Sequence, residues 1–274
     1  MFSIGSHATG WHGVMMVLGI IVAVLLAARL AVKEGISSQA VYTSAFWIVI
    51  CGLIGARLTH VIDDFDYYRN HLTQIFALWE GNASTKARGS KGGMGWYGGF
   101  IGGILAGVVY AKVNKISVGK FADIVGLGVM LGLAIGRIGC TINGDAYGSP
   151  TSLPWGLTYT HPDAFADPFV AGHPAPVYEI IWLLAIFAVL WKLRGRLIPP
   201  GSLFLVTVAL YSFGRFFISW ARAEPDVLGP LHQAHIISIV MFVGALAFLA
   251  YRGVSWAKPG SAGEVTVQEQ NQEH

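Results

Sequence analysis

Long hydrophobic stretches alternate with short polar segments along almost the whole chain. A bilayer core of about 30 Å is crossed by about 20 apolar residues in helical form, and seven stretches reach or approach that length. The third and fourth are less apolar than the others because glycines interrupt them. The pattern therefore predicts an all-α integral membrane protein with seven transmembrane helices, at residues 11–32, 40–58, 97–113, 121–139, 176–193, 201–221 and 232–251.

Basic residues are divided unequally between the segments that join these helices. Ten Lys and Arg residues follow the first, third, fifth and seventh stretches, whereas the alternate segments hold five, four of them in one long loop. Short cytoplasmic segments are enriched in Lys and Arg, so we predict an N-terminus outside and a C-terminus in the cytoplasm. The residues before position 11 lack the basic start of a signal peptide, so the first helix is expected to be retained. Segments 59–95 and 145–175 are long enough for a small extracytoplasmic cap.

The composition agrees with a membrane protein. Hydrophobic residues make up 54% of the chain and charged residues 12%, against about 25% charged residues in an average soluble domain. A formal net charge of +3 is too small for a typical nucleic-acid-binding protein. No repeat or second domain is visible, and no His/Cys cluster has the spacing of a zinc site. We expect one domain over residues 1–256 and a polar, disordered cytoplasmic tail over 257–274.

Polar residues within the predicted helices gather toward the outer side. Arg57 ends the second helix, Arg137 lies near the outer end of the fourth, and Arg215 lies about 9 Å below the outer end of the sixth. A charge inside a membrane is costly and usually faces a cavity or a partner, and the planar fork of arginine suits phosphate. The pattern predicts a site for a phospholipid head group. The alternative left open is that the arginines reach the interface or pair structurally with Asp123, Asp145 or Glu179.

Several short motifs follow one another in a fixed order. They are a glycine-rich segment at 92–99, GRIG at 136–139, NGD with a later glycine at 143–148, PWG at 154–156, HPAPVYE at 173–179, Tyr211-xxx-Arg215, and RAEPD at 222–226. In this order across seven apolar spans, the chain resembles the bacterial prolipoprotein diacylglyceryl transferase family over about residues 11–251. Each motif alone is weak, and their order makes the resemblance specific.

The resemblance implies a multi-pass enzyme of the bacterial plasma (inner) membrane. Such an enzyme transfers the diacylglyceryl group of phosphatidylglycerol to the lipobox cysteine thiol of a prolipoprotein. A thioether forms and glycerol phosphate is released, which is the first step of lipoprotein maturation. The expected partners are phosphatidylglycerol, the prolipoprotein signal peptide and the membrane, with no nucleic acid. Neither a metal nor an organic cofactor is implied.

The resemblance also implies roles for individual residues. Arg137 matches the arginine expected to bind the lipid phosphate, and Arg215 matches the family's second essential arginine. A thiol with a pKa near 8.5 needs help to lose its proton, and His12, Tyr97 and His173 are candidate bases. The predicted catalytic residues are Arg137, Arg215, Tyr97 and His12. The predicted lipid-binding residues are Arg137, Asn143, Gly144, Asp145, Gly148, Tyr211 and Glu179.

Some positions depart from the family pattern. Tyr97 stands where the family commonly has histidine, His12 where it often has tyrosine, Cys140 for asparagine and Ser219 for glutamate. We hypothesise that the first two are a compensated exchange across one site. The departures leave open a divergent family member with another phospholipid donor or thiol acceptor. A non-enzymatic lipid transporter or lipid-binding protein is the further alternative, although many transporters show internal symmetry that is not visible here.

Overall fold

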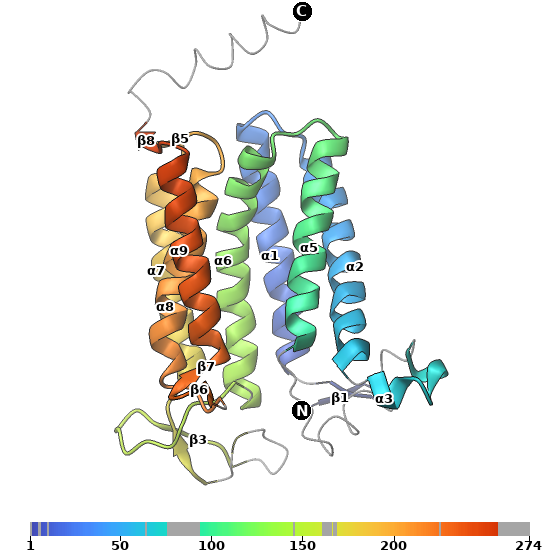
Figure 1. Ribbon diagram of the computed structural model, residues 1–274, viewed down its shortest axis with the longest axis vertical. Coiled ribbons are helices and arrows are strands. Elements are labelled where there is room, and N and C mark those ends of the chain that lie inside the picture. Colours follow the sequence, from blue (N-terminus) through green and yellow to red (C-terminus); the bar gives the residue numbers. More distant parts are fainter. Residues whose placement is uncertain are drawn as a thin grey trace, which may run out of the picture. The chain divides into compact units, whose positions relative to one another are not determined.

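Long helices dominate the computed structural model, which describes residues 2–4, 7–9, 11–63, 65–75, 94–144, 146–160, 166, 169–224 and 226–256 (Figure 1). The long helices are α1 (Trp11–Lys33), α2 (Ser38–Asp63), α5 (Met94–Val113), α6 (Val118–Asn143), α7 (Ala175–Leu193), α8 (Ser202–Ser219) and α9 (Gln233–Tyr251). Two short helices, α3 (Phe65–Tyr68) and the 3-10 helix η1 (Leu72–Ile75), follow α2.

The strands are short and form antiparallel pairs at the ends of the helices. The pairs are β1 (Phe2–Ile4) with β2 (His7–Thr9), β3 (Leu157–Thr158) with β4 (Ala171–Gly172), β5 (Leu197–Ile198) with β8 (Ser255–Trp256), and β6 (Asp226–Leu228) with β7 (Leu231–His232). Each pair forms its own two-stranded sheet.

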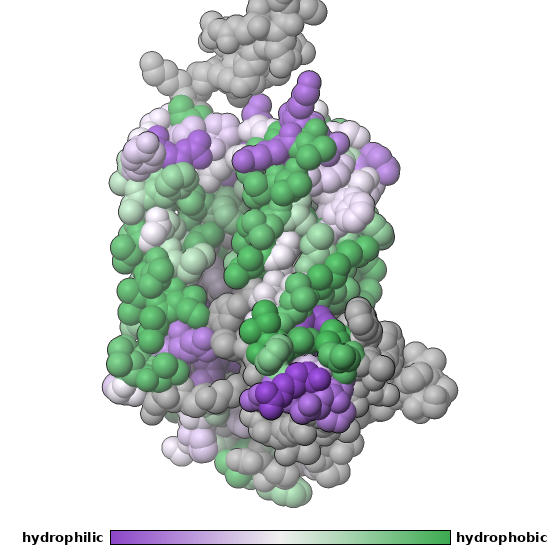
Figure 2. All heavy atoms as spheres, turned by 45° about the vertical axis from the view of Figure 1, so that its right-hand side comes forward, coloured by the Kyte–Doolittle hydropathy of each residue, from purple (hydrophilic) through white to green (hydrophobic). Residues whose placement is uncertain are grey.

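Six of the described helices are long and apolar enough to cross a membrane. In the seventh, α5, the apolar segment Gly98–Val113 is shorter. Side chains along the middle of the helices are largely hydrophobic, and hydrophilic ones gather toward the helix ends (Figure 2). The helical, multi-pass membrane architecture is therefore confirmed, and the count of seven spans stays a prediction.

The fourth predicted span is longer than expected. The prediction ended it at residue 139, but α6 continues to Asn143. Within this last part the Thr141 hydroxyl donates to the Arg137 carbonyl oxygen at 2.9 Å, which occupies an acceptor of the helix end. Arg137 consequently lies six residues before the end of α6, which is about 9 Å at 1.5 Å per residue.

The chain forms two compact units. The larger unit consists of Met1–Leu30 and Gly119–His274, and the smaller unit of Ala31–Val118. The prediction of one domain over residues 1–256 remains a prediction, and the tail at 257–274 lies outside the described residues.

Glycines bring α2 and α5 together in the smaller unit. A Cβ on Gly55 would collide with the carbonyl oxygen of Gly98, so the two backbones are in direct contact, as small residues allow in membrane helices. At the end of α2, Arg57 Nε donates to the Ile75 carbonyl oxygen at 2.9 Å, and its guanidinium lies 5.3 Å from the Tyr68 ring centroid. These contacts give Arg57 a local role in holding the segment after α2.

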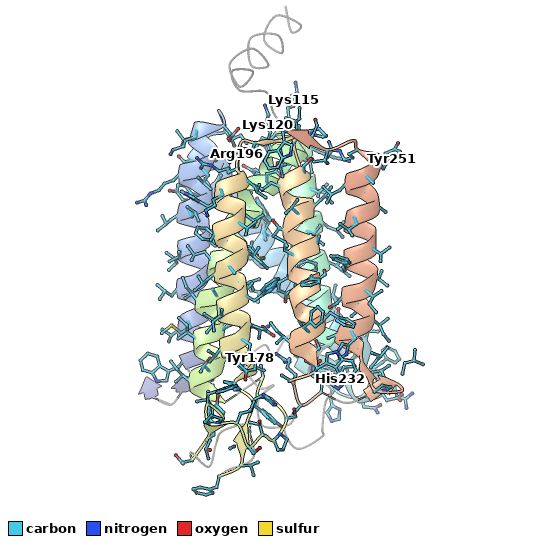
Figure 3. The ribbon with its side chains drawn as sticks, turned by 90° about the vertical axis from the view of Figure 1, so that its left-hand side faces the viewer. Lys115, Lys120, Tyr178, Arg196, His232 and Tyr251 are labelled. Carbon is cyan, nitrogen blue, oxygen red and sulfur yellow. The ribbon has the colours of Figure 1, made fainter. Side chains whose placement is uncertain are left out.

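Close backbone packing also joins α1 to α6 in the larger unit. A Cβ on Gly19 would collide with the Gly132 carbonyl oxygen, and one on Gly128 would lie 2.6 Å from that of Ala23. Along this unit, Lys120, Arg196 and Tyr251 lie at one end, and Tyr178 and His232 lie at the opposite end (Figure 3). We call these the basic end and the site end.

A carboxylate from α6 caps α8 at the basic end. Asp123 Oδ2 accepts from the Gly201 backbone N–H and Oδ1 from that of Phe204, both at 2.7 Å. The residue preceding α8 is Gly201, which has no side chain to offer and lies at φ 95°. Because the first N–H groups of a helix lack intrahelical acceptors, Asp123 supplies the cap that the α8 sequence itself does not contain.

Candidate active site

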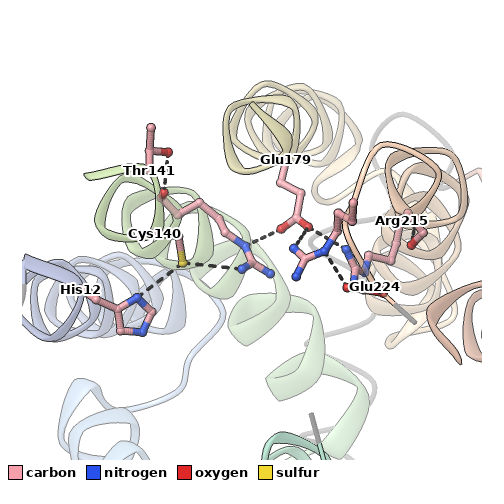
Figure 4. A network of polar contacts seen from close by, with 9 residues as sticks. His12, Cys140, Thr141, Glu179, Arg215 and Glu224 are labelled. Carbon is pink, nitrogen blue, oxygen red and sulfur yellow. Dashed lines mark hydrogen bonds and ion pairs between the residues drawn. The ribbon is translucent and has the colours of Figure 1, made fainter. Parts of the chain in front are cut away.

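A continuous chain of polar contacts crosses the site end of the larger unit (Figure 4). It begins at His12 on α1, passes through α6 and α7, and ends on α8 and the segment that follows α8. The contact chain contains His12, Cys140, Arg137, Glu179, Arg215, Arg222 and Glu224.

Glu179 on α7 is the centre of the cluster. Its side chain is only 3% exposed, and it pairs with three arginines. Oε1 accepts from Arg215 Nη1 at 2.9 Å and from Arg222 Nη1 at 3.1 Å. Oε2 forms an ion pair with Arg137 Nε, although no described donor makes a well-directed hydrogen bond to it. A single buried carboxylate thus holds arginines from three separate parts of the chain.

Glu224 binds two of these arginines from the other side. Its Oε1 accepts from Arg215 Nη2 at 2.8 Å and from Arg222 Nε at 2.6 Å. Burial by itself would raise the pKa of the Glu224 carboxyl, but the positive charges of Arg215 and Arg222 and their hydrogen bonds outweigh burial and hold this pKa below its ordinary value. Glu224 is therefore a carboxylate at neutral pH.

The charges of the described cluster do not cancel. Three arginines, whose side chains are 13% to 22% exposed, face two carboxylates, so one positive charge is in excess. Arg137 Nη2, Arg215 Nε and Arg222 Nη2 also donate to no described residue. Unused donors and a surplus positive charge in a poorly solvated place are the properties of an anion-binding site.

His12 reaches this cluster through Cys140. The His12 Nδ1 atom lies 3.4 Å from Cys140 Sγ, and Arg137 Nη1 donates to the same sulfur at 3.7 Å. The Cys140 side chain is 4% exposed. Two positions that depart from the family pattern, His12 and Cys140, are thus in contact with each other. The side chain of Tyr97 lies outside the described residues, so the hypothesis of a His12–Tyr97 exchange stays untested.

The predicted lipid-binding turn follows α6 directly. Asn143 is the last residue of α6, and Gly144 adopts φ 71°, a conformation that favours glycine. Gly148 is buried, and its N–H donates to the His173 carbonyl oxygen at 3.1 Å. A Cβ on Gly148 would lie 2.5 Å from that of His173, so close backbone packing requires glycine here. Asp145 lies outside the described residues.

The remaining predicted residues lie on α7, α8 and the segment before α7. Tyr211 is one turn before Arg215 and within electrostatic range of both Arg137 and Arg215. His173 Nδ1 lies 3.4 Å from the hydroxyl of Tyr178, the residue that precedes Glu179. The structure therefore brings Tyr211 within electrostatic range of the cluster, whereas His173 contacts Tyr178, whose hydrogen bonds among the described residues do not reach the cluster.

Arg222 and Glu224 belong to the RAEPD motif at 222–226, and no role is predicted for either residue from the sequence. The intervening Ala223 is exposed, so the two flanking side chains share the side that faces the cluster. Ser219, where the family often has glutamate, is fully buried and donates to the Arg215 carbonyl oxygen at 2.7 Å. Glu224 supplies the carboxylate beside Arg215 instead. The only sequence pattern that could have indicated a role for Arg222 and Glu224 is their position as two charged residues shortly after an apolar helix.

Comparisons with a family model and with known proteins all point to one family. The family model described as prolipoprotein diacylglyceryl transferase matches residues 1–251. A protein from Clostridioides difficile is 38% identical over 88% of this chain and 90% of its own length. A relative from Acaryochloris marina is 32% identical over 88% of this chain and 85% of its own length. A relative from Listeria innocua is 31% identical over 93% of this chain and 90% of its own length. All three are named phosphatidylglycerol–prolipoprotein diacylglyceryl transferase.

Proposed function

Because this chain belongs to the prolipoprotein diacylglyceryl transferase family, we propose that it transfers the diacylglyceryl group of phosphatidylglycerol to the lipobox cysteine thiol of a prolipoprotein. The products are a thioether on the cysteine and free glycerol phosphate. The observation that carries this proposal is the surplus positive charge of the partly buried Arg137, Arg215 and Arg222 around two carboxylates. The phosphodiester of the lipid is an anion of the charge and size that the unused arginine donors would bind.

The proposed reaction is a displacement at a glyceryl carbon. The thiolate sulfur forms a bond to this carbon while the bond from the carbon to the phosphate oxygen breaks, and the phosphate leaves with the electron pair. Negative charge grows on the phosphate during this step. Donors fixed in advance around the developing charge lower the barrier. Glu179 holds Arg137 and Arg215 on the same carboxylate, which supports their joint action on one phosphate.

The acceptor thiol must lose its proton in this reaction. We propose His12 as the proton acceptor, because an imidazole titrates near neutral pH and His12 joins the arginine cluster through Cys140. Tyr97 and His173 are the other candidates from the sequence. In the same proposal Asn143, Gly144, Asp145, Gly148, Tyr211 and Glu179 surround the lipid head group.

We propose that the protein spans the bacterial plasma membrane seven times, with its N-terminus outside. Lys120 and Arg196 at the basic end of the larger unit support this orientation, since basic residues are enriched on the cytoplasmic side. The site end then faces the outer leaflet, with segments 59–95 and 145–175 as a cap.

The test uses purified protein in mild detergent with phosphatidylglycerol and a lipobox peptide. Wild type is expected to release glycerol phosphate and to add one diacylglyceryl mass to the peptide. Arg137→Ala is expected to lose both signals by about 100-fold or more, as is usual when a transition-state donor is removed. Arg29→Ala, which removes an exposed arginine from α1, is the matched control and is expected to keep both.

The outcomes separate the alternatives. Turnover with another phospholipid or thiol, but not with this pair, identifies a divergent family member. Bound phosphatidylglycerol without turnover of any donor overturns the transferase proposal and favours lipid binding or transport. Equal activity of Arg137→Ala and wild type would remove the arginine cluster from the mechanism.

A further inference from the structure

A second buried polar group lies beside the arginine cluster and is not used by the proposed reaction. His235, in the first turn of α9, has no exposed surface. The His232 backbone N–H donates to His235 Nδ1 at 3.0 Å. Since Nδ1 acts as the acceptor, the proton of the neutral ring is carried by Nε2.

His235 Nε2 is buried and has no hydrogen-bond partner among the described residues. The ring centroid lies 5.1 Å from that of Phe216 and 4.6 Å from that of Trp220, so its surroundings are aromatic. Most buried N–H groups in native proteins have an acceptor, and an exception calls for an explanation. An acceptor brought by a ligand is one such explanation.

The position of the ring relates this donor to the active site. Phe216 follows Arg215 directly on α8, and His235 lies within electrostatic range of both Arg215 and Glu224. Glu224 uses only Oε1 for its arginines, and its Oε2 accepts no hydrogen bond from a described residue. The unused donor His235 Nε2 and the unused acceptor Glu224 Oε2 therefore belong to two residues within electrostatic range of each other.

We propose that His235 Nε2–H and Glu224 Oε2 bind the head-group glycerol of phosphatidylglycerol and make the protein selective for this donor. The inference rests on the proposed function. A hydroxyl both donates and accepts, so the two hydroxyls of the head group satisfy the carboxylate oxygen and the imidazole N–H together. The head group is linked directly to the phosphate, which places it beside Arg215 when the arginines hold that phosphate.

This subsite also explains rejection of other head groups. An ammonium group, as in phosphatidylethanolamine, has no acceptor for the imidazole N–H. A head group without a free hydroxyl, such as the propyl group of phosphatidylpropanol, leaves both His235 Nε2 and Glu224 Oε2 without a hydrogen-bond partner. Sites that hydrogen-bond a substrate hydroxyl discriminate strongly against analogues that lack it.

The test compares phosphatidylglycerol with phosphatidylpropanol as donors, in wild type, His235→Phe and His235→Gln. Wild type is expected to show a kcat/KM for phosphatidylglycerol at least about 10-fold higher than for phosphatidylpropanol, mainly through KM. His235→Phe keeps a ring of similar size but has no N–H, and is expected to reduce this ratio to about 1 to 3. His235→Gln restores a side-chain N–H and is expected to recover part of the preference. Ser238→Ala, a buried polar change one turn further along α9, is the control and is expected to keep the wild-type ratio.

Retention of the two lipids on the purified protein, measured by native mass spectrometry, gives a reading that does not need turnover. An unchanged lipid preference in His235→Phe overturns the subsite, even if the wild type is fully active. An equal loss for both lipids, with no change in preference, shows a packing role for His235 and also overturns it. Failure of wild type to turn over any donor instead overturns the transferase proposal, and the retention measurement then still decides whether His235 sets lipid preference.

Discussion

The two ends of the larger unit use buried charge in opposite ways. At the basic end, Asp123 directs both carboxylate oxygens at backbone N–H groups of the next-but-one helix. At the site end, Glu179 faces three arginines, and the described charges leave one positive charge uncompensated. The first arrangement is complete without a ligand, whereas the second is complete only when an anion joins it. A charge saturated by backbone groups thus indicates architecture, and an uncompensated cluster indicates a binding site.

The largest expected effect comes from replacing arginine by lysine in the cluster. This change tests whether activity needs the geometry of the guanidinium group or only its positive charge. Arg137→Lys and Arg215→Lys keep the positive charge but lose the planar fork that can hold a carboxylate and a phosphate together. Each is expected to reduce kcat/KM for phosphatidylglycerol by about 100-fold, measured as glycerol phosphate release. Retention of more than half of wild-type activity in both variants would mean that charge suffices and would weaken the contrast between the two ends.

The second effect comes from removing the central carboxylate. Glu179→Gln leaves Arg137 without a described carboxylate partner and Arg215 and Arg222 with Glu224 alone, and loss of one partner from a buried ion pair typically costs about 3–5 kcal/mol. We therefore expect a markedly lower thermal midpoint and about 10-fold lower activity, because Arg137 and Arg215 lose their common support. Added inorganic phosphate should raise the midpoint more in the variant than in wild type. A midpoint that does not respond to phosphate in either protein would contradict an anion-binding cluster.

The third effect concerns the basic end alone. Asp123→Ala removes the cap of α8 and leaves the N–H groups of Gly201 and Phe204 without their acceptor. Loss of a helix cap costs about 0.5–2 kcal/mol, so the thermal midpoint should fall while kcat/KM per folded molecule stays within about twofold of wild type. Asp123→Asn keeps one side-chain oxygen, so its thermal midpoint is expected to lie between those of wild type and Asp123→Ala. A variant with a wild-type midpoint and reduced kcat/KM would show that the basic end also contributes to catalysis.

Different parts of this molecule were predictable from sequence to different degrees. The helices follow from apolar length. The end of α6 was predicted four residues too early, so Arg137 lies further from the helix end than the sequence indicated. Pairing between α6 and α8 through Asp123 was not predictable, because a cap donated by another helix leaves no local pattern. The roles of Arg222 and Glu224 were missed for a similar reason. They lie beyond the end of α8, and the chain must turn back before Arg222 reaches Glu179 and Glu224 reaches Arg215.

The smallest expected effect concerns the acid stability of the site end. The pKa of Glu224 in the folded protein is below its ordinary value of about 4.5, since Arg215 and Arg222 outweigh the effect of burial. The folded state therefore binds the Glu224 proton less readily than the unfolded state does. The stabilisation is fully present above the unfolded pKa and is lost as the pH falls through the folded one.

Wild type should lose thermal stability between about pH 5 and pH 3 more steeply than Glu224→Gln. Differential scanning fluorimetry across this range measures the two slopes. Parallel slopes would mean that the ion pairs of Glu224 with Arg215 and Arg222 do not stabilise the folded protein. Among the carboxylates of the site end, Glu179 alone would then distinguish this end from the basic end.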